Sequence, residues 1–463
     1  TDFTELFRGT RNATTGLLDP GLLAGYANKS FEYNNGAFQL LNSVPILPTG
    51  NTKILASQVW SWLNGRTNVA LRAQNPTAAD TDGNVTIYAF DNKTAVPRTK
   101  LSLGATGDVV IASGVNITAQ SGLSVALQSD SNVNGSGSVK LAGTIDTGET
   151  AQAGNAGSIL INGNVKLGGN SALISKGSVV VTGNISRDTG AANGVNLSVN
   201  ASTLNTGSTA LNSGSINLGT GQLGLTLDSE SKINGAIVAA SLTKAGVGRL
   251  GLFGNNAGLG AITFQSGTLQ VASTSNLAGG NGPLTLGNAN SVTTLQLTTP
   301  NDVQILKPIT LAGNSRIEAV GSLTLSGAIN GSHGLTVDGQ SDITLNDAIG
   351  ATTSLATFNS NSARTLTLGP LAKITSVGDI KISSATRFVN NATDAAPLKP
   401  GSGSRWLIGS GNTNPFAGAT PDVTGGLQHD FRFYGLSQGQ VLGTASLPSS
   451  LPATGNGLIY SLQ

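Results

Sequence analysis

The sequence lacks cysteine and methionine, and aromatic residues make up only 4% of its 463 residues. The absence of cysteine excludes a disulfide framework, a thiol nucleophile and a cysteine-ligated zinc site. A long chain that crosses an oxidising periplasm unfolded also gains from having no thiols that cross-link early. The missing cysteines are therefore consistent with an exported protein.

Charge is also scarce, with 25 Lys and Arg residues against 23 Asp and Glu residues and a formal net charge of +2. No run of basic residues is present, which argues against binding to nucleic acid or to an anionic membrane surface. The apolar runs are short and interrupted by glycine, far below the roughly 20 residues that span a bilayer. No signal peptide is recognisable, and the start at Thr1 indicates a processed chain or a piece of a larger protein.

Aliphatic residues and glycine are abundant, with 38% hydrophobic residues and 63 glycines. A disordered chain usually carries fewer aliphatic residues and more net charge. We therefore expect a folded core of Val, Ile, Leu and Ala, with Gly, Asn, Ser and Thr at the turns.

Short segments that open with Gly-Ser recur in the middle of the chain at a spacing of about 20 residues, a period typical of solenoid repeats. They are GSVKLAGTI from Gly137, GSILINGNV from Gly157 and GSVVVTGNI from Gly177, with related text out of phase at Gly214 and Gly321. The third position of each holds an aliphatic residue (Val139, Ile159, Val179, Ile216, Leu323), and so does the fifth (Leu141, Ile161, Val181, Leu218, Leu325). After a small turn, Ile145, Val165, Ile185 and Ile329 follow.

Alternate side chains lie on one face of a strand, so each segment offers two or three inward aliphatic residues, too few to fold alone. Segments stacked about 4.8 Å apart share one core and satisfy one another's backbone groups. The sequence therefore predicts an all-β fold, a right-handed parallel β-helix of about 20 residues per turn and roughly 17 turns, with altered terminal segments. We expect an irregular β segment or early coils at 1–60, a monomeric β-helix shaft at 61–397 and a C-terminal aromatic-bearing β segment or cap at 398–463.

The aromatic residues gather at these two ends, where a solenoid has no further turn to stack on. Trp60 and Trp62 would alternate onto one strand face, and a second cluster follows near the C-terminus. If the chain binds a sugar, these aromatics are the candidate ligand-binding residues: Trp60, Trp62, Trp406, Phe431, Phe433 and Tyr434. The alternative is that they plug the open ends of the core.

A stretch from Ile54 to Asn132 resembles the haemagglutinin-type repeat of two-partner-secreted exoproteins, the family of filamentous haemagglutinin and the high-molecular-weight adhesins. The matching text includes ILASQVWSWLNGRTNVALRAQ, DGNVTIYAF and GDVVIASGVNITAQSG. LTKAGVGRLGLFGNNAGLGAITFQSGTLQV, from Leu242, resembles the strand repeat of autotransporter passenger domains. SRWLIGSGNTNPFAG, from Ser404, is similar to a segment near the end of haemagglutinin-like shafts.

This resemblance implies secretion through an outer-membrane pore of the two-partner type, a place at the bacterial cell surface, and adhesion, aggregation or biofilm formation. An extracellular polysaccharide or a host-cell glycan would be the ligand. The family is modified at Asn-x-Ser/Thr sites, which begin here at Asn12, Asn28, Asn84, Asn92, Asn116, Asn134, Asn184, Asn196, Asn200, Asn330 and Asn391. The stalk of a contact-dependent toxin-delivery protein is another possibility.

The enzymatic alternative is a β-helical polysaccharide lyase or hydrolase, which needs paired carboxylates. Asp228 and Glu230 could share an outward face, and Asp338, Asp342 and Asp347 follow His333, but a solubilising surface explains these acids better. We therefore expect no catalytic residues, cofactor or metal. An EF-hand-like run at Asp80, Asp82, Asn84 and Asp91 has Val85 where calcium loops need glycine. A groove lined by three or more charged side chains on adjacent turns would favour an enzyme, whereas uniform Ser, Thr and Asn ladders would favour an adhesin.

Overall fold

The computed structural model describes residues 31–34, 37–40, 43–46, 56–65, 67–73, 83–88, 90, 99–119, 122–148, 156–207, 214–277, 282–441 and 445–461. Strands account for 48% of the chain and helix for 4%. The strands stack in parallel as a β-solenoid, which confirms the predicted parallel β-helix, with about 14 turns counted over two compact units. The units are residues 1–192 and 193–463.

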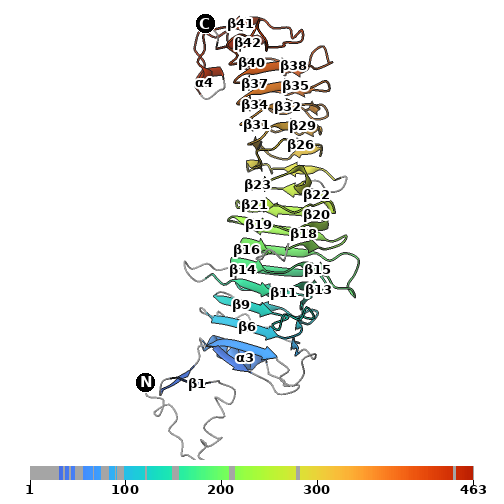
Figure 1. Ribbon diagram of the computed structural model, residues 1–463, viewed down its shortest axis with the longest axis vertical. Coiled ribbons are helices and arrows are strands. Elements are labelled where there is room, and N and C mark those ends of the chain that lie inside the picture. Colours follow the sequence, from blue (N-terminus) through green and yellow to red (C-terminus); the bar gives the residue numbers. More distant parts are fainter. Residues whose placement is uncertain are drawn as a thin grey trace, which may run out of the picture. The chain divides into compact units, whose positions relative to one another are not determined.

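The first unit contains three stacks of parallel strands, visible as superposed arrows in Figure 1. The first stack holds β3 (Ser43–Ile46), β4 (Asn68–Ala73), β6 (Thr99–Ala105), β9 (Leu123–Gln128), β12 (Ile159–Asn162) and the second half of β14 (Ser171–Val181). The second holds β5 (Val85–Ile87), β7 (Val109–Ile111), β10 (Val139–Leu141), β13 (Val165–Leu167) and β15 (Ile185–Arg187). The third holds β8 (Ile117–Thr118), β11 (Thr144–Asp146) and the first half of β14. A hairpin, β1 (Phe31–Asn34) with β2 (Ala37–Leu40), and helix α3 (Ala56–Asn64) precede β4.

The second unit is also built from three stacks, which we name A, B and C. Stack A holds β16 (Leu197–Thr206), β18 (Gln222–Leu227), β20 (Ile237–Ala245), β22 (Leu259–Phe264), β24 (Leu284–Leu286), β27 (Ile309–Leu311), β30 (Ile329–Asn330), β33 (Ala348–Ile349), β36 (Lys373–Thr375) and β39 (Leu398–Lys399), with β17 (Ile216–Asn217) against β20. Stack B holds β19 (Ser231–Ile233), β21 (Arg249–Leu252), β23 (Gly267–Val271), β25 (Thr293–Leu297), β28 (Ser315–Ala319), β31 (Leu335–Gly339), β34 (Phe358–Ser362), β37 (Ile380–Ser384), β40 (Trp406–Ser410) and β42 (Gly457–Tyr460). Stack C holds β26 (Val303–Ile305), β29 (Leu323–Leu325), β32 (Ile343–Leu345), β35 (Thr365–Leu368) and β38 (Arg387–Asn390). The remaining elements are η1 (Thr274–Asn276), β41 (Phe431–Phe433) and α4 (Gln438–Val441).

The core forms as alternation predicts, with aliphatic side chains turned inward on every stack. In stack C, Leu323, Ile343 and Leu366 are register partners on successive turns and all are buried. The intervening Thr324, Thr344 and Thr367 point outward and are half-buried. Continuous aliphatic columns of this kind shield one another from water, which single strands could not do.

The 20-residue register predicted from sequence is confirmed for one pair of turns and wrong for the pair before it. Ile159 pairs with Val179, and Val165 pairs with Ile185. Val139, however, pairs with Val165 in the second stack and not with Ile159 in the first. Coil lengths range from 19 residues, between Gln222 and Ser241, to 34 residues, between Val125 and Ile159. The longer coils explain why there are fewer turns than predicted.

Candidate functional site

The N-terminal aromatic pair does not lie on a strand face. Trp60 and Trp62 belong to helix α3, whose buried positions Val59, Trp60 and Leu63 follow helical spacing. Trp60 is 3% exposed and packs on Phe90, with ring centroids 4.8 Å apart, whereas Trp62 is half-buried. The predicted shared face is therefore wrong, because positions two apart on a helix point in different directions.

The C-terminal aromatic cluster divides into three environments. Trp406 faces the solenoid core opposite Ile380 and is 3% exposed. Phe431 and Phe433, on β41, pack with Leu447 against a small external core of Leu407, Leu436, Leu451 and Ile459. Of the predicted C-terminal ligand-binding residues, only Tyr434 has a largely open ring, at 43% exposed.

Tyr434 belongs to an aromatic group that the predicted set did not include. Its ring stacks on Tyr460 at 5.5 Å, and Phe416 meets both rings edge-on at 6.2 and 5.1 Å. Arg432 lies 5.6 Å from the Phe416 ring centroid. Burial raises the pKa of Tyr460 to about 12. This group offers a small exposed apolar surface, since Phe416 is 51% exposed.

The acidic pairs considered from sequence do not converge. Glu230 forms an exposed ion pair with Lys232 at 3.2 Å, and Asp228 lies on the same turn between β18 and β19. The acids after His333 separate as well. Asp342 accepts the Thr365 N–H at 2.9 Å, and Asp347 accepts the Ala348 N–H at 2.7 Å.

Asp338 instead lies in a polar groove on the outer face of stack B. There Gln296, Glu318, Asp338 and Asn361 are register partners on β25, β28, β31 and β34. Arg316 lies 2.7 Å from Glu318 through Nε and 2.9 Å from Asp338 through one terminal nitrogen. Gln296 donates to Glu318 at 3.3 Å, and Asn361 donates to Asp338 at 2.8 Å. The side chains therefore hold one another in place along four turns.

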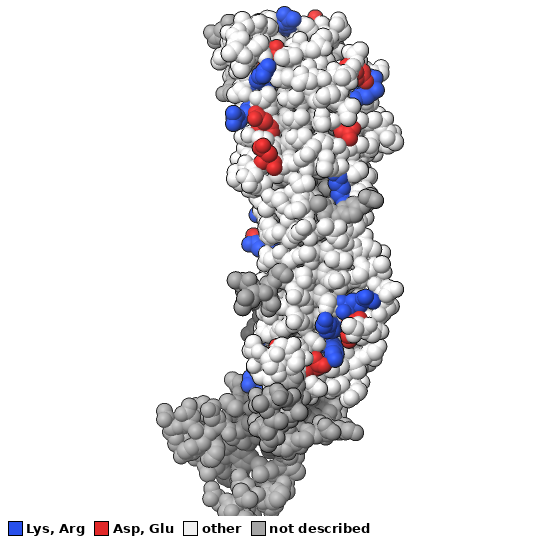
Figure 2. Space-filling model, turned by 45° about the vertical axis from the view of Figure 1, so that its right-hand side comes forward, with Lys and Arg blue, Asp and Glu red and all other residues white. Residues whose placement is uncertain are grey.

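Two hollows make up this feature, which we call the outer groove. The first, of about 390 Å³, is lined by Gln296, Arg316, Glu318 and Asp338, with Val320 and Gln340 along one side. The second, of about 570 Å³, lies over β34, β37 and β40 and is covered in part by Gln440 and Ala445–Leu447. Both hollows are lined by Asn361, which makes the groove continuous. On the face shown in Figure 2, charged side chains form small mixed groups on a largely uncharged surface.

The sequence reasoning named Asp338 but missed the rest of the outer groove. A signal was present, since Arg316 and Glu318 flank the inward Ile317 in a chain that is only 10% charged. Charged residues at two successive outward positions of a strand mark a polar surface patch. The groove can donate and accept hydrogen bonds on adjacent turns.

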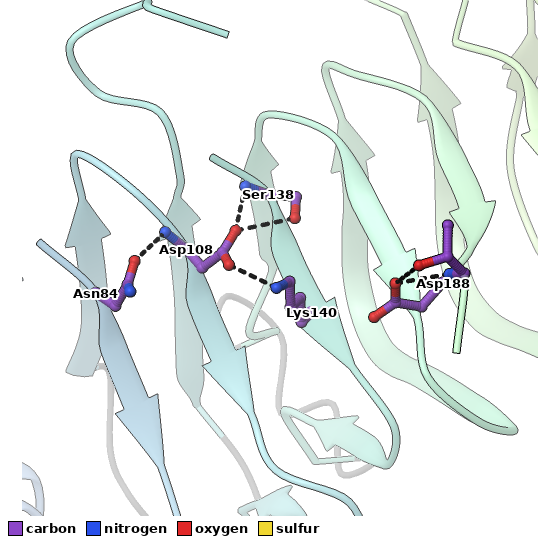
Figure 3. A network of polar contacts seen from close by, with 6 residues as sticks. Asn84, Asp108, Ser138, Lys140 and Asp188 are labelled. Carbon is purple, nitrogen blue, oxygen red and sulfur yellow. Dashed lines mark hydrogen bonds and ion pairs between the residues drawn. The ribbon is translucent and has the colours of Figure 1, made fainter. Parts of the chain in front are cut away.

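A polar network in the first unit has a structural role (Figure 3). Asp108 accepts the Ser138 N–H at 2.8 Å and forms an ion pair with Lys140 at 2.7 Å, while its own N–H donates to Asn84. Partial burial acts to raise the pKa of Asp108, but the hydrogen bonds from Lys140 and Ser138 outweigh it and lower that pKa below 3.8. Asp188 stands apart, with Oδ1 accepting from Thr189.

The same type of bond explains several predicted modification sites. The Oδ1 atom accepts a backbone N–H from the following turn at 2.7–2.9 Å in Asn84, Asn116, Asn196 and Asn330. These asparagines therefore tie turns together, and their modification stays a prediction. Asn12, Asn28 and Asn92 lie outside the described residues, as do Asp80, Asp82 and Asp91 of the EF-hand-like run.

Lys244 is a charged residue inside the solenoid, fully buried on β20. Its Nζ donates to the carbonyl oxygens of Gly246, Gly248 and Ser266 and lies 5.0 Å from the Phe264 ring centroid. Burial lowers the pKa of Lys244 to about 8. Three carbonyl acceptors suit the three donors of an ammonium group, so Lys244 closes a turn.

Comparison with protein-family models, curated proteins and solved structures gives no match to the chain. Among the described residues, no three acidic or histidine side chains gather as a metal-binding group. None of the helices in the described ranges has the length and apolar character needed to cross a bilayer.

Proposed function

We propose that the chain is a shaft of a secreted bacterial surface adhesin, which holds adhesive surfaces away from the cell and attaches to polysaccharide. The main support is the outer surface of the stacked turns, which repeats uncharged polar side chains. Thr324, Thr344 and Thr367 form one such ladder, and Thr285, Thr310 and Asn330 form another. Such ladders are what we expect of an adhesive or spacing shaft.

The resemblance of Ile54–Asn132 to two-partner-secreted exoproteins supports the same proposal. On this basis the partner for export is an outer-membrane pore of the two-partner type, and the protein acts at the cell surface. The solenoid architecture is compatible with it, because parallel coils build a long surface from short repeats.

Attachment of protein-coated microspheres to polysaccharide-bearing bacterial cells tests the proposal. We expect attachment that is lost when the cells are first treated with periodate, which oxidises vicinal diols of glycans. Microspheres coated with the heat-unfolded chain serve as the control. Equal attachment of folded and unfolded protein, or no attachment to any cell surface, would contradict an adhesive role.

The outer groove supports a second candidate, a β-helical polysaccharide-degrading enzyme. Arg316, Glu318 and Asp338 are three charged side chains on adjacent turns, as such a groove requires. Release of new reducing ends or unsaturated sugars from polysaccharide would support it, provided that Glu318→Gln and Asp338→Asn each abolish the release. Product formed equally by both variants would exclude these carboxylates from catalysis.

A further inference from the structure

The outer groove has the dimensions of a binding site for an extended polymer. It follows stack B from β25 to β40, five strand steps that span about 24 Å at roughly 4.8 Å per step. One outward polar side chain is presented on each of several successive turns, including Gln296, Glu318, Asp338 and Asn361. This repeat is close to the length of one sugar unit in an extended chain.

The charges in the groove balance. Arg316 and Lys381 contribute two positive charges, and Glu318 and Asp338 contribute two negative charges. Arg316 contacts both carboxylates, so neither acid presents an isolated charge. A strongly anionic or cationic polymer finds no net attraction here, whereas a neutral ligand rich in hydroxyl or amide groups finds both donors and acceptors.

The groove is also prearranged. The ladder bonds of Gln296 to Glu318 and of Asn361 to Asp338 fix these side chains before any ligand arrives, which lowers the entropy lost on binding. Along the first hollow, Val320 is 39% exposed and offers an apolar wall for the C–H faces of a sugar. Over the second hollow, Gln440 and Ser446 provide polar groups on the opposite side.

We propose that the outer groove binds a neutral, extended oligosaccharide that lies along the solenoid axis and contacts one turn per sugar unit. This inference rests on the proposed adhesive function and names its ligand class and site. A peptide strand does not fit, because the backbone groups of β25, β28, β31 and β34 are already paired within the parallel ladder, and strand addition needs a free edge.

Titration calorimetry of the whole chain with defined hexasaccharides tests the proposal. The neutral probes are cellohexaose, maltohexaose and N-acetylated chitohexaose, and hexagalacturonate is the anionic probe. The variant Asn361→Trp places a bulky ring where the two hollows join, and Gln296→Trp fills the first hollow. Thr344→Trp is the matched control, since Thr344 also points outward but lies on stack C.

We expect at least one neutral hexasaccharide to bind, with Kd raised about tenfold or more by Asn361→Trp and by Gln296→Trp and unchanged by Thr344→Trp. The inference is overturned if no neutral probe binds, if only hexagalacturonate binds, or if both groove variants bind as tightly as the wild type. Circular dichroism of each variant identifies a misfolded one, and the other groove variant then decides the result. Microsphere attachment that persists without hexasaccharide binding would remove this site and leave the adhesive function standing.

Discussion

Gly177 lies directly on Gly157 at the same corner of two successive turns. The Gly177 N–H donates to the Gly157 carbonyl oxygen at 3.0 Å, and a Cβ added to Gly177 would lie 2.3 Å from that oxygen. Neither residue can gain a side chain without moving the backbone of its neighbour. Close stacking of turns therefore sets the need for glycine here.

We expect Gly177→Ala to lower the free energy of unfolding by about 2–4 kcal/mol, because the new methyl group forces adjacent turns apart. Gly190→Ala is the matched control, since a Cβ at Gly190 meets no atom within 4 Å. Guanidinium titration of both variants measures the difference. Equal stability of Gly177→Ala and Gly190→Ala would show that the corner is not tightly stacked.

Lys244→Met should destabilise the second unit by about 2–4 kcal/mol at pH 7, although it removes a buried charge. The variant leaves the carbonyls of Gly248 and Ser266 without their Lys244 donor, and buried unsatisfied groups are costly. Lys244→Gln, which keeps a donor, should recover part of the loss. Thermal unfolding measures both, and a Met variant as stable as the wild type would contradict this role for Lys244.

The lowered pKa of Lys244 also predicts how stability changes with pH. Below pH 8 the side chain is protonated in the folded and unfolded states, and the cost of burying the charge is fully present. Between pH 8 and its ordinary value of 10.5 the folded state releases the proton first, so the unfolded state binds more protons and stability rises with pH. We expect a gain of about 2 kcal/mol between pH 7 and pH 10 in the wild type, absent in Lys244→Met. A flat wild-type profile would contradict it.

Asp108→Ala should cost about 1–2 kcal/mol at pH 7, because Ser138 and Lys140 lose their acceptor. The pKa of Asp108 is lowered by folding, so its contribution is present above the ordinary value of 3.8 and is lost as pH falls through the lower folded value. The gap between variant and wild type should therefore close in acid. Asp188→Ala, at a neighbouring acid outside this network, should change stability little at either pH. Urea titrations at pH 7 and pH 3 check both variants.

The fold class was predictable because inward aliphatic columns leave a strong period-two pattern, as in Leu323 and Leu325. The register was only partly predictable. Val139 on the second stack and Ile159 on the first carry the same alternation, because every face of a solenoid buries one side of its strands. Alternation therefore identifies a strand without identifying its stack.

The candidate site was less predictable than the fold. Asp338 was visible as an acid, but its proximity to Arg316 and Gln296 follows from coil lengths of 20 and 22 residues that the text does not mark. Trp60 and Trp62 were misplaced because their spacing fits a strand, although Val59 and Leu63 already show the four-residue spacing of a helix.

Engineered disulfides test the stacking of turns most directly, because the chain has no cysteine of its own. Thr324 and Thr344 are direct partners on adjacent parallel strands, about 4.8 Å apart at the Cα atoms, within disulfide range. Thr324 and Thr367 lie two turns apart, at about 9.6 Å, beyond that range. After mild oxidation of dilute protein, thiol titration should find no free thiols in Thr324→Cys/Thr344→Cys and both thiols free in Thr324→Cys/Thr367→Cys. Free thiols in the first variant, or equal oxidation of the two, would contradict the parallel solenoid.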